Sequence, residues 1–331
     1  MTIGAATVGL GVGEQHARTL VATGECALRW VYDLDAAKSR RIAGELGARA
    51  ADGYDDILND GLVQLITLAS YDDAHGEQAI AALAAGKHVF VEKPLCRSLD
   101  ELQRVKSVWQ QSARHLAANL VLRGAPLYQW LRSAIAAAEL GEVFAIDGDY
   151  LYGRLDKITA GWRKDVVDYS VLQGGGVHLV DLMLWLTGQR PAAVAAVGAA
   201  VATRGTAYRY NDFVAATYRF ESGLVGRITA NFGCVHPHQH VLRVFGTRAT
   251  FIHDDCGARL QTSREPSAPW RTIDLSPLPS SKGVLIPRFV ASIVGDRDHA
   301  AETQHEFDLM SACLAADRAV ASGDSETIAY V

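Results

Sequence analysis

The sequence predicts an α/β protein, in which a doubly wound parallel sheet is followed by an α+β domain with an open, mainly antiparallel sheet. Three observations support this prediction. At 331 residues, the chain is long enough for two domains. Up to Leu120, short β-type runs alternate with helical patterns, as in a parallel sheet covered by helices. Beyond that point, strand-like runs follow one another directly, which favours antiparallel pairing.

The first predicted domain covers residues 1–121 and alternates strands with helices. Apolar, β-prone runs predict strands at residues 5–9, 28–32, 62–68, 88–91 and 114–120. Helical periodicity predicts helices at 14–21, 36–46 and 74–84, and a further helix that begins after Ser98. Ser98 and Glu101 have the spacing of a capping box, which marks the start of that helix.

The second predicted domain covers residues 122–331 and is richer in consecutive strands. It opens with a helix at 127–138, a strand at 143–152 and a helix at 177–186. Strand-like runs follow at 208–220, 224–232, 241–245 and 250–253, with a Glu221-Ser222-Gly223 turn between the first two. A proline-rich surface excursion at 266–287 and a final helix at 303–321 complete the prediction.

Composition and charge exclude several classes of protein. With 49% hydrophobic and 21% charged residues, the chain is not disordered, coiled coil or collagen-like. A formal net charge of −5 without a basic block argues against a nucleic-acid partner. Five dispersed cysteines without a CxxC pair indicate a reducing compartment. Because no signal-peptide pattern or bilayer-length apolar run is visible, we expect a soluble cytoplasmic protein without a membrane partner.

A glycine-rich turn directly follows the first predicted strand. In Gly9-Leu10-Gly11-Val12-Gly13, the glycines allow a tight turn and let a pyrophosphate approach the N-terminus of the next helix. The segment departs from the G-x-G-x-x-G fingerprint, because residue 14 is glutamate and Gly13 comes one place early. A plain strand–helix turn is the alternative interpretation.

Asp33 strengthens the dinucleotide interpretation. It ends the second predicted strand, 20 residues after Gly13, where a carboxylate accepts hydrogen bonds from an adenosine ribose diol. The same carboxylate repels a 2′-phosphate, so NAD is favoured. The nearby basic residues Lys38, Arg40 and Arg41 leave NADP open. The structural alternative is that Asp33 only caps the following helix.

A lysine lies just beyond the predicted strand 88–91. Glu92-Lys93-Pro94 follows this strand at the carboxyl edge of the sheet, where doubly wound folds bind their ligands. A lysine beside a nicotinamide is able to take or return the proton of a substrate hydroxyl during hydride transfer. The alternative is a solvated Lys93 that only pairs with Glu92.

Together these segments resemble the glucose–fructose oxidoreductase/inositol dehydrogenase (Gfo/Idh/MocA) family. The resemblance rests on the glycine turn, Asp33, the Ala69-Ser70-Tyr71 strand end with His75, residues 85–95, and residues 176–181 leading to Trp185. It runs nearly end to end, and residues 86–94 are its most specific part. It implies an N-terminal Rossmann domain, a sugar or cyclitol substrate, and a homodimer or homotetramer assembled through the open sheet.

The resemblance also implies individual site residues. Lys93 is implied as the acid/base lysine, and His178 as the histidine beside the reacting carbon of the substrate. The implied cofactor contacts are Gly9, Leu10, Gly11, Val12, Gly13, Asp33, Leu34, Ala69, Ser70, His75, Glu92, Lys93 and Pro94.

One departure from the family pattern concerns the second domain. The family places an aspartate four residues before the histidine, but residue 174 of this chain is glycine. Asp165, Asp168 and Tyr169 are the alternatives for the missing polar group, unless no residue supplies it.

Substrate-binding candidates surround the histidine in the sequence. Asp181 stands three residues after His178 on a predicted helix, so the two share a face, and a neighbouring aspartate is able to set the tautomer of a histidine. Tyr150 and Tyr152 alternate along a strand, so they either stack on a sugar ring or pack the sheet. The predicted substrate contacts are Tyr152, Lys157, Trp162, Arg163, Asp168, Tyr169 and Asp181.

A second histidine cluster lies further along the chain. His236, His238 and His240 alternate, which places three imidazoles on one side of an extended segment. Lining of the substrate pocket and metal binding are the two functional alternatives. No local carboxylate or thiol completes a ligand set, so we expect no metal.

The leading functional hypothesis is an NAD(P)-dependent oxidoreductase. It would transfer a hydride between nicotinamide and a hydroxyl or keto carbon of a sugar, cyclitol or sugar derivative, nucleotide-linked sugars included. Two alternatives use the same fold. One is a dinucleotide-binding regulator without catalysis, which the glycine at 174 permits. The other is a glycosidase that uses bound NAD without net oxidation.

Overall fold

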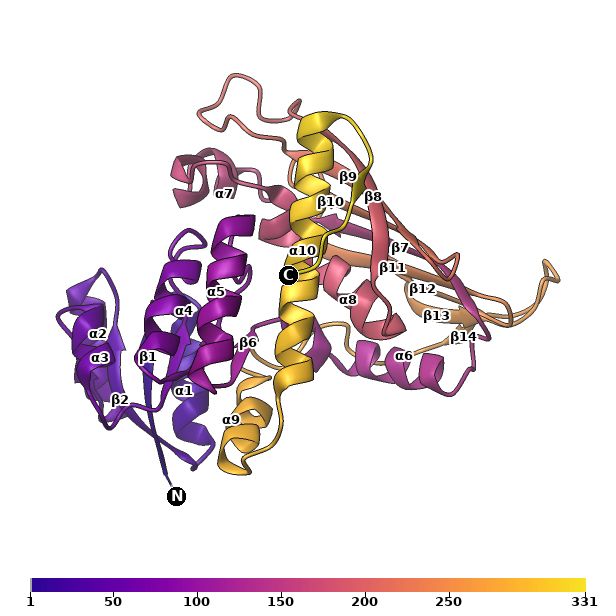
Figure 1. The fold of residues 1–331 in the computed structure, drawn as a ribbon. Helices are drawn as coiled ribbons and strands as arrows, with labels where there is room; N and C mark the ends of the chain where they lie inside the picture. Colours follow the sequence, from indigo (N-terminus) through magenta and orange to yellow (C-terminus); the bar gives the residue numbers. More distant parts are fainter. Residues whose placement is uncertain (1) are drawn as a thin grey trace. The chain divides into compact units, whose positions relative to one another are not determined.

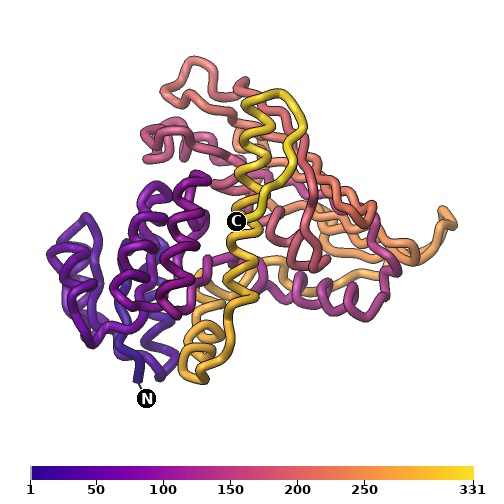
Figure 2. The backbone as a smooth tube through the Cα atoms, viewed as in Figure 1, coloured from indigo at the N-terminus to yellow at the C-terminus, as the bar shows by residue number. Residues whose placement is uncertain are grey.

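The computed structural model describes residues 2–331, which form two compact units. The first unit holds the chain up to Gly124, the segment Pro279–Met310 and Val331. The second unit holds Ala125–Leu278 and Ser311–Tyr330. The predicted division at residue 121 lies near the first crossing, but the sequence did not indicate that the chain returns to the first unit at Pro279. Figure 2 shows this return, where the orange segment lies close to the indigo and purple part of the same unit.

The first unit is built on a six-stranded parallel sheet with strand order β3-β2-β1-β4-β5-β6. Figure 1 shows most of this unit in indigo and purple and its helix α9 in orange. This order is that of a Rossmann fold, so the predicted parallel architecture is confirmed. The strands are β1 (Ile3–Val8), β2 (Cys26–Tyr32), β3 (Arg49–Ala50), β4 (Leu65–Leu68), β5 (His88–Val91) and β6 (Leu116–Ala118). The helices are α1 (Gly13–Ala22), α2 (Ala36–Leu46), α3 (Tyr54–Asn59), α4 (His75–Ala84), α5 (Leu99–Ser112), the 3-10 turn η1 (Val121–Gly124), α9 (Ile286–Val294) and the start of α10 (Ala300–Ser322).

The predicted elements of this unit are present, with ends shifted by a few residues. The Ser98 hydroxyl accepts a hydrogen bond from the Glu101 amide at the start of α5, so the predicted cap is confirmed. The sequence analysis missed α3 and the two-residue β3. It also missed α9, which begins inside the predicted proline-rich excursion. Pro287 lies in the first turn of α9, where proline fits a helix.

The second unit is built on a nine-stranded sheet with order β14-β13-β12-β11-β7-β10-β9-β8-β15. Only β7 and β10 pair in parallel, so the predicted mainly antiparallel sheet is confirmed. The strands are β7 (Val143–Leu151), β8 (Pro191–Ala199), β9 (Phe213–Phe220), β10 (Val225–Asn231), β11 (Gln239–Gly246), β12 (Thr250–Asp254), β13 (Gly257–Gln261), β14 (Arg271–Thr272) and β15 (Glu326–Thr327). The helical segments are α6 (Pro126–Ala136), α7 (Asp156–Thr159), η2 (Trp162–Asp165), the π-helical turn η3 (Leu172–Gly176), α8 (Val177–Thr187) and the rest of α10.

Helix α8 packs closely on the central strands of this sheet. A Cβ on Gly148 of β7 would lie 3.2 Å from Leu179, and a Cβ on Gly226 of β10 would lie 2.1 Å from the Met183 sulfur. A side chain at either position would therefore crowd α8, far more severely at Gly226 than at Gly148. The sequence analysis missed β8, because alanine and glycine, which have low strand propensity, dominate it.

Among residues 2–331, no helix combines the length and the apolar character needed to cross a membrane.

Candidate functional site

The glycine turn between β1 and α1 is constrained by the end of β4. Gly9 has a φ of +80°, and a Cβ there would lie 2.4 Å from the Ala69 carbonyl oxygen. Gly13 is also tight, since its Cβ would lie 3.0 Å from Ala69 Cβ and 3.1 Å from Thr7 Cγ2. Gly13 thus allows the close packing of helix on strand that the third glycine of the fingerprint usually allows. The departure noted at residue 14 therefore leaves the turn intact.

The turn leaves room for a ligand at its middle glycine. A Cβ on Gly11 would meet nothing within 4 Å, and Gly11 and Val12 are both exposed. Val12 caps α1 without a side-chain hydrogen bond, so no side chain of the cap satisfies the first amides of this ten-residue helix. A phosphate accepts hydrogen bonds from such amides and is attracted by the helix dipole. The turn therefore fits a dinucleotide pyrophosphate.

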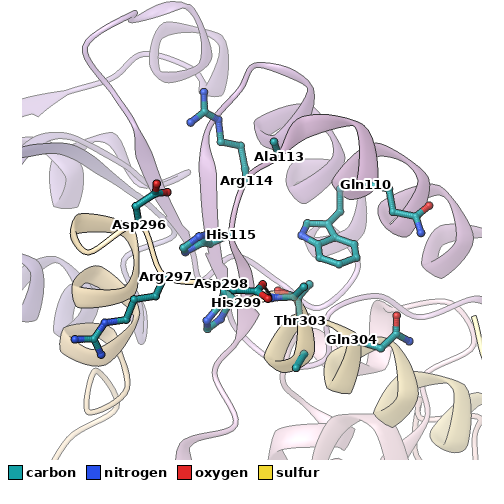
Figure 3. Close-up of a pocket in the computed structure, with 13 residues that line it drawn as sticks. Gln110, Ala113, Arg114, His115, Asp296, Arg297, Asp298, His299, Thr303 and Gln304 are labelled. Carbon is teal, nitrogen blue, oxygen red and sulfur yellow. Dashed lines mark hydrogen bonds between the residues drawn. The ribbon is translucent and has the colours of Figure 1, made fainter.

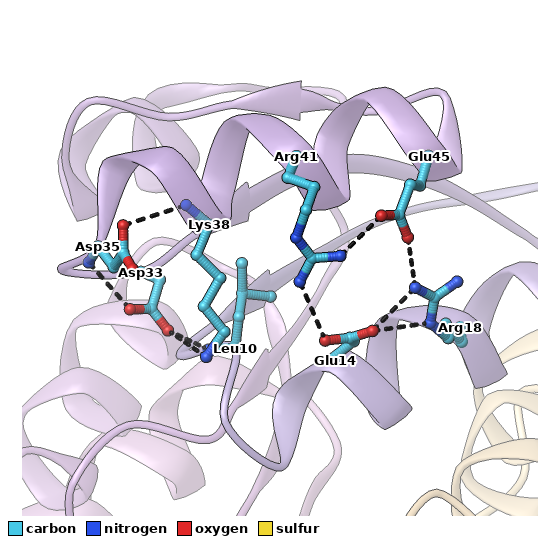
Figure 4. A network of polar contacts seen from close by, with 8 residues as sticks. All are labelled: Leu10, Glu14, Arg18, Asp33, Asp35, Lys38, Arg41 and Glu45. Carbon is cyan, nitrogen blue, oxygen red and sulfur yellow. Dashed lines mark hydrogen bonds and ion pairs between the residues drawn. The ribbon is translucent and has the colours of Figure 1, made fainter.

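Asp33 lies directly against this turn (Figure 4). Its Oδ2 accepts a hydrogen bond of 2.6 Å from the Leu10 amide, and its Oδ1 accepts one of 2.9 Å from the Asp35 amide. The Lys38 ammonium lies 3.6 Å from Oδ2. The side chain that caps α2 is Asp35, which accepts from the Ala37 and Lys38 amides, so the alternative in which Asp33 is the cap is wrong. The carboxylate therefore lies against the turn, and its contact with an adenosine ribose stays a prediction.

A ring of four charged residues joins α1 to α2 beside this site (Figure 4). Arg18 binds Glu14 at 2.8 Å and Glu45 at 2.5 Å, and Arg41 binds Glu45 at 2.6 Å. The Arg41 guanidinium also lies 3.7 Å from Glu14, the residue in the place of the third glycine. Two carboxylates therefore engage Arg41. This weakens the argument for NADP that its basic charge offered in the sequence.

His75 ties two loops of the predicted cofactor site together. The residue is fully buried, with Nδ1 2.8 Å from the Pro94 carbonyl oxygen and Nε2 3.2 Å from the Ser70 carbonyl oxygen. Its ring thereby links the loop after β4 to the loop after β5. A neutral imidazole donates through only one of its nitrogens, so one of these two contacts is a hydrogen bond in each tautomer, and either one supports a loop that carries a predicted site residue. The cofactor contact of His75 stays a prediction. Leu34, in contrast, is 79% exposed and contacts little of the unit.

The glutamate next to Lys93 is held by residues that the sequence analysis did not single out. Asn119 donates a hydrogen bond of 2.6 Å to Glu92 Oε1, and the buried His16 places its Nε2 3.3 Å from the same oxygen. Burial alone would raise the pKa of Glu92, but His16, Lys93 and Asn119 together hold it at about 2. Glu92 is therefore ionised at neutral pH and anchored to the end of β6. No sequence signal pairs positions 16, 92 and 119, because they come from three separate elements.

The second group of predicted residues lies in the second unit, around the start of α8. His178 and Asp181 are both buried, at 8% and 1% exposure, and the His178 ring meets His240 edge-on with centroids 6.0 Å apart. Tyr150 and Tyr152 stack on each other with centroids 5.9 Å apart. Both rings also pack on Phe232, as the sheet-packing interpretation expects, and the substrate contact of Tyr152 stays a prediction.

The remaining predicted substrate contacts lie on the segment before η3. Arg163 Nε donates a hydrogen bond of 2.9 Å to the Tyr169 hydroxyl, and its guanidinium lies 4.4 Å above the Trp162 ring. Lys157 and Asp168 are exposed. Of the three alternatives for the missing polar group, Asp165 is exposed and paired with Lys164, Asp168 is exposed, and Tyr169 is buried.

The three alternating histidines do not form one cluster. His238 and His240 meet with ring centroids 4.9 Å apart, and both contact Tyr150. His236 instead lies 3.3 Å from Asp255 and 2.7 Å from the Pro237 carbonyl oxygen. The prediction of three imidazoles on one side is wrong, because the chain around Pro237 turns the first ring away. Within the part of the chain that the structure describes, no three His, Cys, Asp or Glu residues gather as metal ligands.

Asp317 of α10 anchors the π-helical turn and was also missed by the sequence analysis. Its carboxylate accepts hydrogen bonds of 2.7 Å from the Ser170 hydroxyl and 2.7 Å from the Gln173 amide. Burial raises the pKa of Asp317 to about 6, although both hydrogen bonds and Arg318 lower it. These partners lie 144 and 147 positions away in sequence, so no local pattern reveals the contact.

We expect Asp317 to make the folded state less stable as pH rises. The pKa of Asp317 in the folded state lies above its ordinary value, so the folded state binds the proton more tightly than the unfolded state does. The stability that this proton contributes is present below about pH 4 and is lost as the pH rises to about 6. The resulting loss in the free energy of unfolding is at most about 3 kcal/mol, since each pKa unit corresponds to about 1.36 kcal/mol. Asp317→Asn should flatten the pH dependence of denaturant unfolding in this range, while the exposed Asp324→Asn should not. Equal slopes for wild type and Asp317→Asn would contradict the assignment.

A separate cavity of about 790 Å³ lies in the first unit, between the end of α5 and the start of α10 (Figure 3). His115 and His299 stack in it with ring centroids 5.2 Å apart. Burial lowers the pKa of both, that of His299 to about 4, so the pair is neutral at pH 7. Asp298 accepts a hydrogen bond from the Ala300 amide at the start of α10. The residues that line this cavity include none of the predicted site residues.

Two family models match the chain. The model described as an oxidoreductase family with an NAD-binding Rossmann fold matches residues 3–120. The model described as the GFO/IDH/MocA C-terminal domain matches residues 128–252.

The chain is also similar to individual proteins, at 17–28% sequence identity in the examples that follow. Inositol 2-dehydrogenase 2 of Saccharopolyspora erythraea is 28% identical over 193 residues, which are 57% of this chain and 55% of that protein. The chain therefore spans about half the length of this relative. UDP-N-acetylglucosamine 3-dehydrogenase of Acidithiobacillus ferrooxidans is 27% identical over 225 residues, 68% of this chain and 65% of that protein. A solved levoglucosan dehydrogenase complex with NADH has a TM-score of 0.88 and 17% identity over 100% of both chains, which shows a shared fold.

Proposed function

The chain belongs to the Gfo/Idh/MocA family of NAD-binding oxidoreductases, and from this we propose that it is an NAD-dependent dehydrogenase of a sugar or cyclitol hydroxyl group. The observation that carries the proposal is the Asp33 carboxylate, bonded to the Leu10 amide of the glycine turn. A plain strand–helix turn has no need of a carboxylate contact at that place. The relatives named as dehydrogenases of inositol, levoglucosan and UDP-N-acetylglucosamine support the class of substrate.

The first unit would hold the cofactor. The amides at the start of α1 would bind the pyrophosphate, with Gly11 leaving room for it. Asp33 would accept hydrogen bonds from the adenosine ribose, and Ser70 and Lys93 would lie along the loops that follow β4 and β5. When bound, the nicotinamide supplies the hydride acceptor.

Lys93 would handle the proton of the reacting hydroxyl. Its position after β5 is fixed by the bonds of its neighbours, since His75 holds the Pro94 carbonyl and Asn119 holds Glu92. In our proposal the Lys93 amine takes the hydroxyl proton as the C–H bond breaks, and returns it in the reverse direction. His178, with Asp181 one turn away on α8, is the second residue that we propose to contact the substrate.

The proposal is tested with the purified protein, NAD⁺ and NADP⁺, and a panel of myo-inositol, levoglucosan and UDP-N-acetylglucosamine. We expect tight NAD⁺ binding and NADH formation with at least one panel member. Binding without NADH formation on any member would favour the regulator. Cleavage of a glycoside while NADH never accumulates would favour the redox-neutral glycosidase. A cytoplasmic location and a homodimeric or homotetrameric assembly stay predictions.

Cofactor choice offers a direct check on Asp33. We expect Asp33→Ser to weaken NAD⁺ binding by about tenfold or more, because a charged hydrogen bond is lost, and to bring NADP⁺ closer to NAD⁺ in affinity, because the repulsion of a 2′-phosphate is lost. The measurement is a fluorescence titration with both cofactors. Asp35→Ser is the matched control, since serine retains the cap of α2. An unchanged preference in Asp33→Ser would remove Asp33 from the cofactor site.

A further inference from the structure

Residue 174 lies on the same helical segment as His178 and has no side chain. The π-helical turn η3 (Leu172–Gly176) continues directly into α8, which carries His178. Residues four apart on a helical segment face nearly the same side, so a side chain at position 174 would point to the face that carries His178. In the family pattern an aspartate stands at the position of residue 174. In this chain the space of that side chain is filled by another residue.

The hydroxyl of Tyr169 occupies it. A Cβ built on Gly174 would lie 2.0 Å from the Tyr169 phenol oxygen and 2.7 Å from its Cζ. Any side chain at 174 would therefore start where the phenol oxygen already lies. Gly175 also leaves space for a tyrosine, since a Cβ on Gly175 would lie 2.3 Å from the Tyr150 ring. The two glycines thus make room for two tyrosines.

The surrounding residues fix the orientation of this hydroxyl. Arg163 Nε donates to the phenol oxygen at 2.9 Å. Because an arginine only donates, the phenol oxygen is the acceptor in this bond, and its O–H group is still able to act as a donor. The ring is 4% exposed and packs edge-on against Trp162 and Tyr208. Asp168, just before it, has a φ of +53°, a conformation that occurs in non-glycine residues mainly where the surroundings enforce it.

The backbone beneath the hydroxyl is anchored as well. Ser170 and Gln173, on either side of the start of η3, both donate to the Asp317 carboxylate. A single π-helical turn inside a helix is frequently found at a functional site. Here it sets the spacing between position 174 and His178. The polar group next to position 174 is therefore the hydroxyl of Tyr169, which lies in the loop before η3.

We propose that the Tyr169 hydroxyl, held by Arg163, is the hydrogen-bonding group for the substrate on the His178 face, in the place of the aspartate. This inference rests on the proposed dehydrogenase function. It also alters the chemistry of the site. An ionised aspartate only accepts hydrogen bonds, whereas the Tyr169 hydroxyl is also able to donate one, and Arg163 beside it carries a positive charge. The site is accordingly built for a substrate that presents an oxygen acceptor there.

The test compares Tyr169→Phe with Tyr208→Phe. Both replace a 4% exposed tyrosine of the same cluster, but the Tyr208 hydroxyl donates to the Asn211 carbonyl, and the three atoms nearest a Cβ on Gly174 all belong to Tyr169. The probe is the member of the panel of myo-inositol, levoglucosan and UDP-N-acetylglucosamine that the wild type oxidises fastest with NAD⁺. We expect Tyr169→Phe to lower kcat/KM by about 10- to 100-fold with an unchanged NAD⁺ affinity, and Tyr208→Phe to stay within about threefold.

A second test moves the polar side chain from position 169 to position 174. Gly174→Asp alone should lose activity and thermal stability, because its Cβ meets the phenol oxygen at 2.0 Å. In the Tyr169→Ala background the same change should raise kcat/KM about tenfold over Tyr169→Ala alone, since the space is free and a polar group returns.

The outcomes separate the two proposals. A wild type that oxidises no panel member overturns the dehydrogenase, and this inference falls with it. An active wild type with an equally active Tyr169→Phe overturns the role of Tyr169 alone. If the exchange variants fail to fold, the Tyr169→Phe comparison still decides.

Discussion

Replacing Lys93 with methionine is expected to lower turnover by about 10²–10⁴-fold while NAD⁺ binding changes little. Methionine keeps the length and apolar stem of lysine but lacks the amine that takes the hydroxyl proton. The loop itself should stay in place, because its anchors are the His75 bond to the Pro94 carbonyl and the Asn119 bond to Glu92. Steady-state NADH formation and a separate NAD⁺ titration measure the two quantities.

A matched lysine in the same unit serves as the control. Lys106 lies on α5, where its ammonium donates to Gln304, and it belongs to neither predicted half of the site. Lys106→Met should therefore leave turnover near the wild-type value. If Lys93→Met turned over at the wild-type rate, Lys93 would not be the acid/base group. If it lost NAD⁺ binding as well, its main role would be cofactor binding.

Replacing Gly9 with alanine should abolish cofactor binding at ordinary concentrations and destabilise the first unit. The new methyl group would lie 2.4 Å from the Ala69 carbonyl oxygen, a backbone atom that cannot move without shifting the end of β4. The positive φ adds the strain of a left-handed alanine. We expect a loss of about 2–4 kcal/mol in the free energy of unfolding, from strain and overpacking together.

A Gly24→Ala variant separates the strain of a positive φ from the steric overlap with Ala69. It has a φ of +70°, close to that of Gly9, but a Cβ there would meet nothing within 4 Å. Gly24→Ala should cost about 1–2 kcal/mol of stability and leave NAD⁺ affinity unchanged. The measurements are denaturant unfolding and an NAD⁺ titration for both variants. Equal affinity of Gly9→Ala and wild type would show that the turn does not carry the pyrophosphate.

The sequence by itself determined the class of both sheets and predicted the residues of the cofactor half of the site. Strand and helix periodicity is a local property, and it placed β1, α2 and β5 within a few residues. Gly9 and Asp33 were also identified locally, since each follows a strand of a parallel sheet. Parallel strands end at one edge, so the two had to meet, and Asp33 accepts from the Leu10 amide next to Gly9.

The tertiary structure alone decided which side chains share space. Spacing in the sequence showed that residue 174 is glycine, but only packing showed that the Tyr169 hydroxyl fills that place. The bond from Gln173 to Asp317 and the bond from Asn119 to Glu92 likewise join elements far apart in sequence. Such contacts depend on how helices and loops pack against one another. Periodicity and motif spacing report the local backbone, so they carry no information about these contacts.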